Sequence, residues 1–306
     1  MQVSGMKHFP VMLDEVISAL APKNGEVYVD ATFGNGGYSQ KVLEAADCKV
    51  IAVDRDPTVS PRAQEFKKIY GERFDFRAGC FGSLKDLVNE SVDGVMFDIG
   101  VSSMQLDEAK RGFSFAKAAP LDMRMSCEGT TAADIVNTMP EKELADLIYQ
   151  YGEERKSRQI AAKIVAYRNT KPIETTTELA EIIYSVIHRS PQLTTDPATK
   201  TFQALRIAVN HELDELRDGL NAAVSILKPM GRIVVVSFHS LEDRIVKNFF
   251  RAESGNQANV SRYLPQNTVT QTIALTNISK AITPTRTELE KNPRSRSAKL
   301  RFAQKI

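Results

Sequence analysis

Two aspartates lie on either side of a glycine-rich turn near the start of the chain, and their spacing suits the binding of a cofactor. Asp30 precedes the sequence Thr-Phe-Gly-Asn-Gly-Gly-Tyr-Ser of residues 32–39, and Asp54 ends the next apolar run. Glycines let a backbone turn sharply and let a ligand approach it closely. Asp30 would repel a pyrophosphate but would suit an ammonium group, and Asp54 is placed to accept hydrogen bonds from both hydroxyls of a ribose. A cofactor with a ribose, a cationic amino-acid end and no phosphate is S-adenosylmethionine.

Two other interpretations of this turn stay open. A nicotinamide dinucleotide would use the same ribose-binding acid, although Ser39 stands where its third glycine is expected and Asp30 disfavours the pyrophosphate. If no ligand binds, Asp30 is a helix N-cap and Asp54 is a loop carboxylate.

The ends of the next two predicted strands would complete the cleft, because ligands of open α/β sheets bind beyond the carboxyl ends of the strands. Phe81 follows the third strand and is placed to pack on an adenine ring, with packing in the core as its alternative. Asp98 follows the fourth strand, where a methyltransferase of this architecture places the groups nearest the transferred methyl. The alternative for segment 98–105 is a polar turn.

Apolar runs of strand length alternate with helix-periodic segments, which predicts parallel β-α units. Between the fourth and fifth strands, helical periodicity interrupted by prolines predicts an inserted domain over residues 107–211. The predicted fold class is therefore α/β, with an α/β domain formed by residues 1–106 and 212–306 and an all-helical insertion. The predicted strands are Val27–Asp30, Val50–Asp54, Phe74–Arg77, Gly94–Asp98 and Arg232–Phe238, and the predicted helices of the insertion include Glu141–Tyr151, Glu153–Tyr167 and Thr177–His188.

The composition is that of a globular protein, with 42% hydrophobic and 25% charged residues among 306. The chain has neither an apolar N-terminal region nor a run of membrane-spanning length, so we expect a cytoplasmic protein without membrane contact. No metal site is expected, because metal-ligand spacing is absent among the cysteines and histidines, which are Cys48, Cys80, Cys127, His8, His188, His211 and His239.

The C-terminal segment is strongly basic. Residues 284–306 include seven basic and two acidic side chains, so this segment carries +5 and the rest of the chain −3, for a total of +2. Such a segment is either a solvated tail or an arm that contacts phosphate. Arg294 and Arg296 alternate after Pro293, which favours an extended backbone with both side chains on one face. We expect them to contact phosphate, and pairing with Glu288 or Glu242 is the alternative.

The chain resembles the RsmH (MraW) family of 16S ribosomal RNA cytosine-N4 methyltransferases over nearly its whole length. The motifs that carry the resemblance are His8-x-Pro-Val11, Asp30-x-Thr-x-Gly-x-Gly-Gly37, Asp54-Arg-Asp-Pro57, Asp98-x-Gly-Val-Ser-Ser103, Arg111-Gly-Phe-Ser-Phe115, Pro120-Leu-Asp-Met-Arg-Met125, Tyr151-Gly-Glu-Glu154, Thr201-Phe-Gln-Ala-Leu-Arg-Ile207, Ser237-Phe-His-Ser-Leu-Glu-Asp-Arg244 and Asn292-Pro-Arg-Ser-Arg-Ser-Ala-Lys-Leu300.

The resemblance implies S-adenosylmethionine as cofactor and, as target, a cytidine in the decoding centre of 16S ribosomal RNA in the small ribosomal subunit or its precursor. It also implies a Rossmann-like S-adenosylmethionine-dependent methyltransferase domain with an inserted all-helical domain that recognises the substrate. The cofactor contacts that it implies are Gly36, Gly37, Tyr38, Asp54, Phe81, Asp98 and Gln105. The chain departs from the family pattern at Tyr38, Asp196, Lys200 and Met230, and the second and third of these leave local substrate contacts open.

Methylation of a cytosine amine needs help, because the nitrogen lone pair is delocalised into the ring. The enzyme must hold the amine in line with the methyl group and accept its hydrogen bonds. We expect Asp98 or a neighbouring backbone carbonyl to accept them, and Ser102 or Ser103 to fix the base. The candidate substrate-binding residues are Arg111, Phe113, His239, Arg294 and Arg296, with Phe115 as a second stacking candidate. The alternatives are core packing for the phenylalanines and a structural role for His239.

Two other functions are compatible with these features. One is a ribosomal RNA-binding assembly factor whose methyltransferase site is inactive, and the other is a nicotinamide-dependent oxidoreductase. The intact acids Asp30, Asp54 and Asp98 argue against the first. The sequence does not define the oligomeric state, for which a homodimer is one candidate.

Overall fold

The computed structural model describes residues 10–190, 192, 195–255 and 273–306, and it divides the chain into two compact units. Unit 1 comprises Met1–Gly100 and Leu213–Ile306, and unit 2 comprises Val101–Glu212. The sequence placed the first boundary after residue 106, whereas unit 1 already ends at Gly100. The reason is that the fourth strand ends at Asp98 and the chain leaves the sheet there. His8 of the first motif lies outside the described residues.

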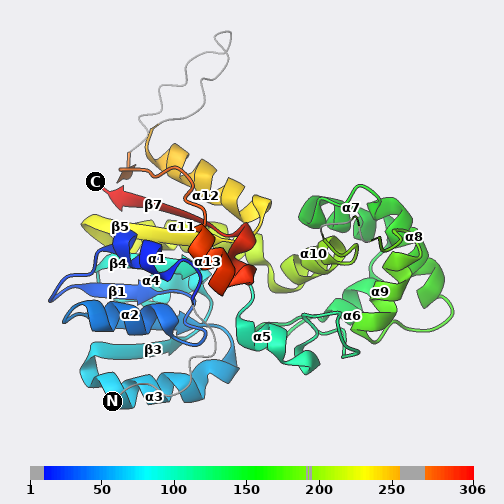
Figure 1. The fold of residues 1–306 in the computed structure, drawn as a ribbon, viewed down its shortest axis with the longest axis horizontal. Helices are drawn as coiled ribbons and strands as arrows, with labels where there is room; N and C mark the ends of the chain where they lie inside the picture. Colours follow the sequence, from blue (N-terminus) through cyan, green and yellow to red (C-terminus); the bar gives the residue numbers. More distant parts are fainter. Residues whose placement is uncertain (1–9, 191, 193–194, 256–272) are drawn as a thin grey trace, which may run out of the picture. The chain divides into compact units, whose positions relative to one another are not determined.

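Unit 1 is built on a seven-stranded sheet with the order β3-β2-β1-β4-β5-β7-β6 (Figure 1). β1 to β5 are parallel, whereas β7 runs antiparallel to both of its neighbours. The strands are β1 (Val27–Asp30), β2 (Lys49–Asp54), β3 (Phe74–Ala78), β4 (Val92–Asp98), β5 (Leu227–Ser237), β6 (Leu275–Thr276) and β7 (Lys299–Lys305). All five predicted strands are present. The strand order reverses between β1 and β4, which is where open sheets of this kind bind ligands.

Helices cover both faces of this sheet (Figure 1). One face packs against α4 (Leu84–Leu87), α11 (Glu212–Ile226) and α12 (Ser240–Glu253) in a continuous apolar core. The other face carries α1 (Leu13–Leu20), α2 (Gly37–Ala45) and α3 (Ser60–Tyr70). Because strands buried on both faces need apolar side chains at nearly every position, the inner strands β1 and β2 contain short apolar runs in the sequence.

The end of the C-terminal segment, Lys299–Lys305, forms β7 of the sheet, which corrects its interpretation as a solvated tail. Phosphate contact by Arg294 and Arg296 stays a prediction. Leu300 and Ala303 are fully buried in β7. The side chains of Lys299 and Arg301 pair with the carboxylate of Asp243 in α12, with N–O distances of 3.1 and 2.7 Å. These basic residues therefore hold β7 in place.

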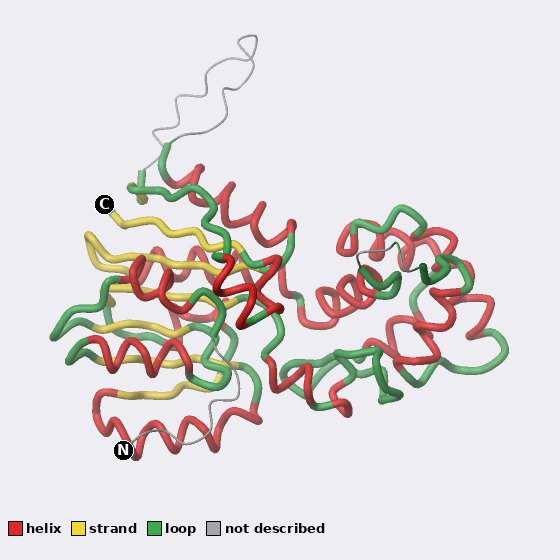
Figure 2. Tube along the Cα trace, viewed as in Figure 1, coloured by secondary structure: helices red, strands yellow, loops and turns green. Residues whose placement is uncertain are grey.

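Unit 2 consists of helices around its own apolar core, and Figure 2 shows no strand in its described residues. The helix predicted from Glu153 starts only at Ser157, because Glu153 adopts a left-handed conformation (φ 50°) that ends the preceding helix. The helices are α5 (Ser103–Asp107), α6 (Ala132–Thr138), α7 (Glu141–Gly152), α8 (Ser157–Arg168), α9 (Thr176–Tyr184) and α10 (Thr199–Asn210). Within the described ranges of the chain, every helix is too short or too polar to cross a membrane.

Candidate active site

The glycine turn after β1 has a conformation that depends on its glycines. Gly36 has φ +78°, and a Cβ atom added to it would lie 2.5 Å from Cζ of Phe66. A Cβ atom on Gly37 would lie 2.1 Å from Cγ of Pro10. The Nε atom of Arg62 donates a hydrogen bond to the carbonyl of Asn35 at 3.2 Å. Phe66 and Pro10 thus pack against the two glycines, and Arg62 holds the carbonyl of Asn35. The glycines themselves contribute no side chain that would cover the backbone of the turn.

Asp54 at the end of β2 supports this turn. Its Oδ2 accepts a hydrogen bond from the Gly34 amide at 2.7 Å, and its Oδ1 accepts one from the Asp56 amide at 2.9 Å. Burial raises the pKa of Asp54, although these amides act against the shift. A carboxylate offers about four acceptor positions, so each oxygen retains capacity for a second donor such as a ribose hydroxyl.

Asp30 at the end of β1 is almost fully buried, with 1% exposure. Its Oδ2 accepts a hydrogen bond from the Ser39 hydroxyl at 2.7 Å, and its Oδ1 accepts one from the Thr32 amide at 3.2 Å. The N-cap of α2 is Gly36, so Asp30 is not a helix cap. The sequence treated Ser39 only as a missing glycine, whereas its hydroxyl connects α2 to β1. Burial raises the pKa of Asp30 to about 6.

Asp98 at the end of β4 differs from the other two acids, because one of its carboxyl oxygens has no hydrogen-bond partner in the described part of the chain. Its Oδ1 is buried and receives no hydrogen bond from the described residues. Its amide donates to Oγ1 of Thr32 at 2.7 Å, which fixes the backbone beside β1. Burial, with smaller contributions from the charges of Asp30 and Glu242, raises the pKa of Asp98 to about 8. Such a buried, unpartnered acid points to a ligand that supplies the missing donor.

Two further candidates of unit 1, Phe81 and His239, make contacts that stabilise the fold. Phe81 packs edge-on against Phe97, with ring centroids 5.6 Å apart, and lies directly on Gly219 of α11. His239 is the N-cap of α12, where its Nδ1 accepts a hydrogen bond from the Glu242 amide and its Nε2 lies 2.9 Å from the Glu242 carboxylate. The structural role that the sequence allowed for His239 is therefore present.

Ser102 and Gln105 belong to unit 2, where they form the capping box of α5. Oγ of Ser102 accepts from the Gln105 amide at 3.2 Å, and Oε1 of Gln105 accepts from the Ser102 amide at 3.0 Å. Gln105 is 6% exposed. The pair thus sets the start of α5, and the roles expected of both residues in binding stay predictions.

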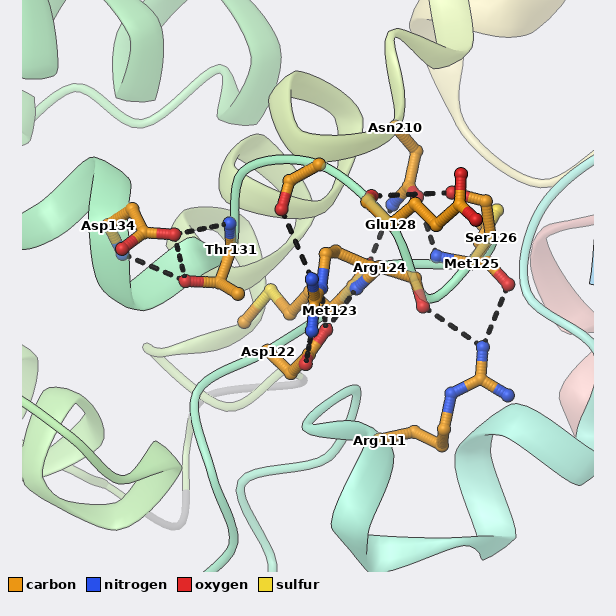
Figure 3. Close-up of polar contacts among 11 residues, drawn as sticks. Arg111, Asp122, Met123, Arg124, Met125, Ser126, Glu128, Thr131, Asp134 and Asn210 are labelled. Atoms are coloured by element: carbon orange, nitrogen blue, oxygen red, sulfur yellow. Dashed lines mark hydrogen bonds and ion pairs between the residues drawn. The ribbon is translucent and has the colours of Figure 1, made fainter.

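Arg111 and Phe113 also contribute to the structure of unit 2. Nη2 of Arg111 donates to the carbonyls of Arg124 and Met125, both at 2.9 Å (Figure 3). Phe113 is 9% exposed and belongs to the apolar core, whereas Phe115 packs edge-on against Phe202 with centroids 4.8 Å apart. Phe113 therefore packs in the core, which was the alternative to stacking on the base.

The loop that Arg111 contacts is held from a second side by Asn210. The side chain of Asn210 donates to the Met123 carbonyl and accepts from the Met125 amide, both at 2.8 Å (Figure 3). Met123 between these contacts has φ +65°, a conformation that costs a residue with a side chain about 1 kcal/mol or more. Sequence analysis missed Asn210, because its partners lie more than eighty residues away.

The arginines of the C-terminal segment are not arranged as expected. Pro293–Ser297 form a 3₁₀ turn rather than an extended segment, because the Ser295 amide and hydroxyl both bond to the Asn292 carbonyl. With three residues per turn, residues two apart point in different directions. Arg294 and Arg296 are exposed, but the prediction that both project from one face is wrong.

Two departures from the family pattern have local partners in unit 2. The carboxylate of Asp196 accepts hydrogen bonds from the Tyr184 hydroxyl at 3.0 Å and from the Ala198 amide at 2.9 Å. Nζ of Lys200 donates to the Glu153 carbonyl at 3.1 Å. Both residues therefore stabilise the beginning of α10 and the end of α7.

The third departure, Met230, adopts a left-handed conformation with φ +66° and is 67% exposed. Glycine would adopt this conformation without strain. The substitution thus introduces local strain in β5, away from the acids of the site.

The sheet order is that of a Rossmann-like fold, and the family match reported next makes the chain an S-adenosylmethionine-dependent methyltransferase. Comparison with known proteins narrows the class. Residues 5–306 match the model of the MraW methylase family. A protein of Paramagnetospirillum magneticum named ribosomal RNA small subunit methyltransferase H is 52% identical over 308 residues, which cover 98% of this chain and 96% of that protein. A protein of the same name from Rickettsia akari is 52% identical over 303 residues, with 98% of both chains covered. The chain belongs to the MraW methylase family.

Solved structures resemble the chain more distantly. An rRNA methylase from Streptococcus thermophilus gives a TM-score of 0.41 at 11% identity, with 99% of each chain covered. A SAM-dependent O-methyltransferase from Thermotoga maritima gives 0.42 at 11% identity, with 98% of this chain and 68% of that chain covered.

Proposed function

We propose that this protein transfers a methyl group from S-adenosylmethionine to the N4 amine of a cytidine in the decoding centre of 16S ribosomal RNA. Membership of the MraW methylase family supports the reaction type, and the names of relatives at 52% identity support the small-subunit RNA as substrate. The partner is then the small ribosomal subunit or its precursor in the cytoplasm. The choice of cytidine N4 rests on the motifs shared with the family.

The observation that carries the proposal is the buried carboxyl of Asp98, whose Oδ1 has no partner among the described residues. Buried acceptors are nearly always satisfied in the functional state, so we assign the missing donor to the substrate. An exocyclic amine offers two N–H donors, and Asp98 lies at the edge of the sheet where ligands bind.

This carboxyl supplies what the chemistry needs. S-adenosylmethionine contributes a methyl group on a positively charged sulfonium. Positive charge nearby favours the ionised form of a carboxyl, so Asp98 becomes a carboxylate acceptor in the loaded enzyme. By accepting a hydrogen bond from the amine, Asp98 orients the nitrogen and lets it pyramidalise as the new N–C bond forms. The alkylated nitrogen is acidic, and in this proposal Asp98 takes its proton.

The other acids hold the cofactor in this proposal. Asp54 receives the ribose hydroxyls on its remaining acceptor positions, and Asp30 supplies negative charge near the ammonium end. Gly36 and Gly37 are cofactor contacts implied by the family, and Phe66 and Pro10 hold their turn in shape by filling the positions of the missing side chains. Gln105 and Phe81 remain cofactor contacts implied by the family.

The test compares Asp98→Ala with wild type. Small subunits from cells lacking the modification are incubated with methyl-labelled S-adenosylmethionine, and S-adenosylhomocysteine binding is measured by calorimetry. We expect the variant to lose methyl transfer while its affinity changes too little to explain the loss. Asp14→Ala, which removes an exposed carboxyl of α1, is the matched control. Turnover of Asp98→Ala near the wild-type level would refute the role of this residue, and RNA binding without labelling by wild type would favour an inactive assembly factor.

A further inference from the structure

The segment Pro10–Met12 packs directly on the glycine turn. The Pro10 ring occupies the space that a side chain at position 37 would need, since a Cβ atom there would lie 2.1 Å from its Cγ. Val11 is 9% exposed and Met12 is fully buried. The segment is therefore part of the interior of unit 1, although it precedes the first helix.

Two hydrogen bonds from distant elements hold this segment. The Tyr38 hydroxyl, in the first turn of α2, donates to the Val11 carbonyl. The Met12 amide donates to Oε1 of Glu288 at 3.3 Å, and Glu288 belongs to α13 (Arg286–Lys291). Met12 itself has φ +53°. A strained conformation persists only where its surroundings determine it, so this packing is specific.

Tyr38 connects the segment Pro10–Met12 to the glycine turn. Its backbone continues from Gly37 into α2, and its side chain, which is 4% exposed, reaches the segment that covers Gly37. Burial raises the pKa of Tyr38 well above its usual value, so the hydroxyl keeps the proton that it donates. A phenylalanine would retain the ring packing but leave the buried Val11 carbonyl without this donor.

We propose that Tyr38 is a positioning residue for the methyl donor. Its hydroxyl holds Pro10–Met12 on Gly37 and thereby keeps the Gly36–Gly37 turn in the conformation that receives S-adenosylmethionine. The inference rests on the proposed cofactor site, and the hydroxyl acts through Pro10 without touching the cofactor. If the segment is docked in only a fraction of molecules, the apparent dissociation constant rises in inverse proportion to that fraction.

The experiment measures S-adenosylhomocysteine binding to Tyr38→Phe by calorimetry. We expect the affinity to fall about five- to tenfold, as for the loss of one buried hydrogen bond. In turnover, KM for S-adenosylmethionine rises while kcat at saturating cofactor stays near wild type. Pro10→Ala should weaken binding in the same way, and the double variant should lose less than the product of the two single effects, because both changes act on one contact.

Tyr28→Phe is the matched control, because it removes a hydroxyl that accepts from the Lys23 amide at 3.0 Å near the amino end of β1. Tyr28 is 1% exposed. A purely structural role for Tyr38 predicts that both variants lower Tm and leave affinity unchanged. That result would overturn the inference while the methyltransferase assignment stands. Failure of the wild type itself to bind S-adenosylhomocysteine would overturn the cofactor site and the inference together.

Discussion

Replacing Asp98 with asparagine should make the cofactor-free protein more stable at pH 8, although it removes a residue of the proposed active site. Burial raises the pKa of Asp98 in the folded protein from 3.8 to about 8. Between these pH values the folded chain binds a proton that the unfolded chain has released. The part of the free energy of unfolding that depends on Asp98 is therefore fully present below about pH 4 and is lost as the pH rises toward 8. Asparagine resembles the protonated acid and does not titrate, so the free energy of unfolding of the variant does not fall with pH in this way.

The size of the effect follows from the same shift. Each pH unit between the two pKa values costs about 1.4 kcal/mol, so the whole loss is on the order of 5 kcal/mol. Between pH 6 and pH 8 alone, the free energy of unfolding should fall by about 2 kcal/mol, allowing for partial titration near the upper limit. For a unit of this size, that corresponds to a decrease in Tm of roughly 4–8 °C.

Scanning calorimetry of the cofactor-free protein at pH 6 and pH 8 measures this decrease. We expect Asp98→Asn to flatten the pH dependence and to raise Tm at pH 8. Asp14→Asn, which changes an exposed carboxyl, should keep the wild-type dependence. If Asp98→Asn melted at or below the wild-type temperature at pH 8 with an unchanged pH dependence, the assignment of a buried, protonated Asp98 would be wrong.

Three other variants test separate parts of the structure. Asp54→Ala removes charge-assisted hydrogen bonds worth about 1.5–3 kcal/mol each as an upper range, so S-adenosylhomocysteine binding should weaken at least tenfold by calorimetry, and unchanged affinity would exclude Asp54 from the site. Met230→Gly relieves a left-handed conformation and should raise the stability by up to about 1 kcal/mol; a lower Tm would show that the Met230 side chain contributes more than its conformation costs. Replacing Arg294 and Arg296 with alanine should weaken binding to the small subunit and flatten the logarithmic salt dependence by about 0.7 for each lost contact to single-stranded phosphate, with one single variant accounting for most of the loss because the two side chains diverge. A lower Tm with an unchanged salt slope would instead indicate that they only stabilise the C-terminal segment.

The parts of the fold that sequence analysis predicted are those determined by local patterns. Strands β1, β2 and β4 are rich in apolar residues because helices cover both faces of the sheet, and the turn at Gly36 needs a positive φ that glycine provides. Asp54 and Asp98 lie at the strand ends where the sequence predicted them, because parallel strands bring their carboxyl ends to one edge. These features require no knowledge of distant contacts.

The features that were missed depend on residues far apart in the chain. β7 buries Leu300 and Ala303, but the strand also contains Lys299 and Arg301, whose structural role is hidden until Asp243 is known to pair with them. The bond between Tyr38 and Val11 spans 27 residues. Such contacts leave no periodic signal in the sequence, so basic residues that stabilise a strand cannot be distinguished there from basic residues that bind phosphate.

The central claim concerns which atom is methylated, and nucleoside analysis of the product tests it most directly. Small subunits from cells lacking the modification are incubated with the purified protein and methyl-labelled S-adenosylmethionine, and their 16S RNA is fragmented and analysed by mass spectrometry. We predict a single labelled nucleoside, N4-methylcytidine, in the fragment that contains the decoding centre. Label at C5 of cytosine, on another base or in another region of the RNA would contradict the account.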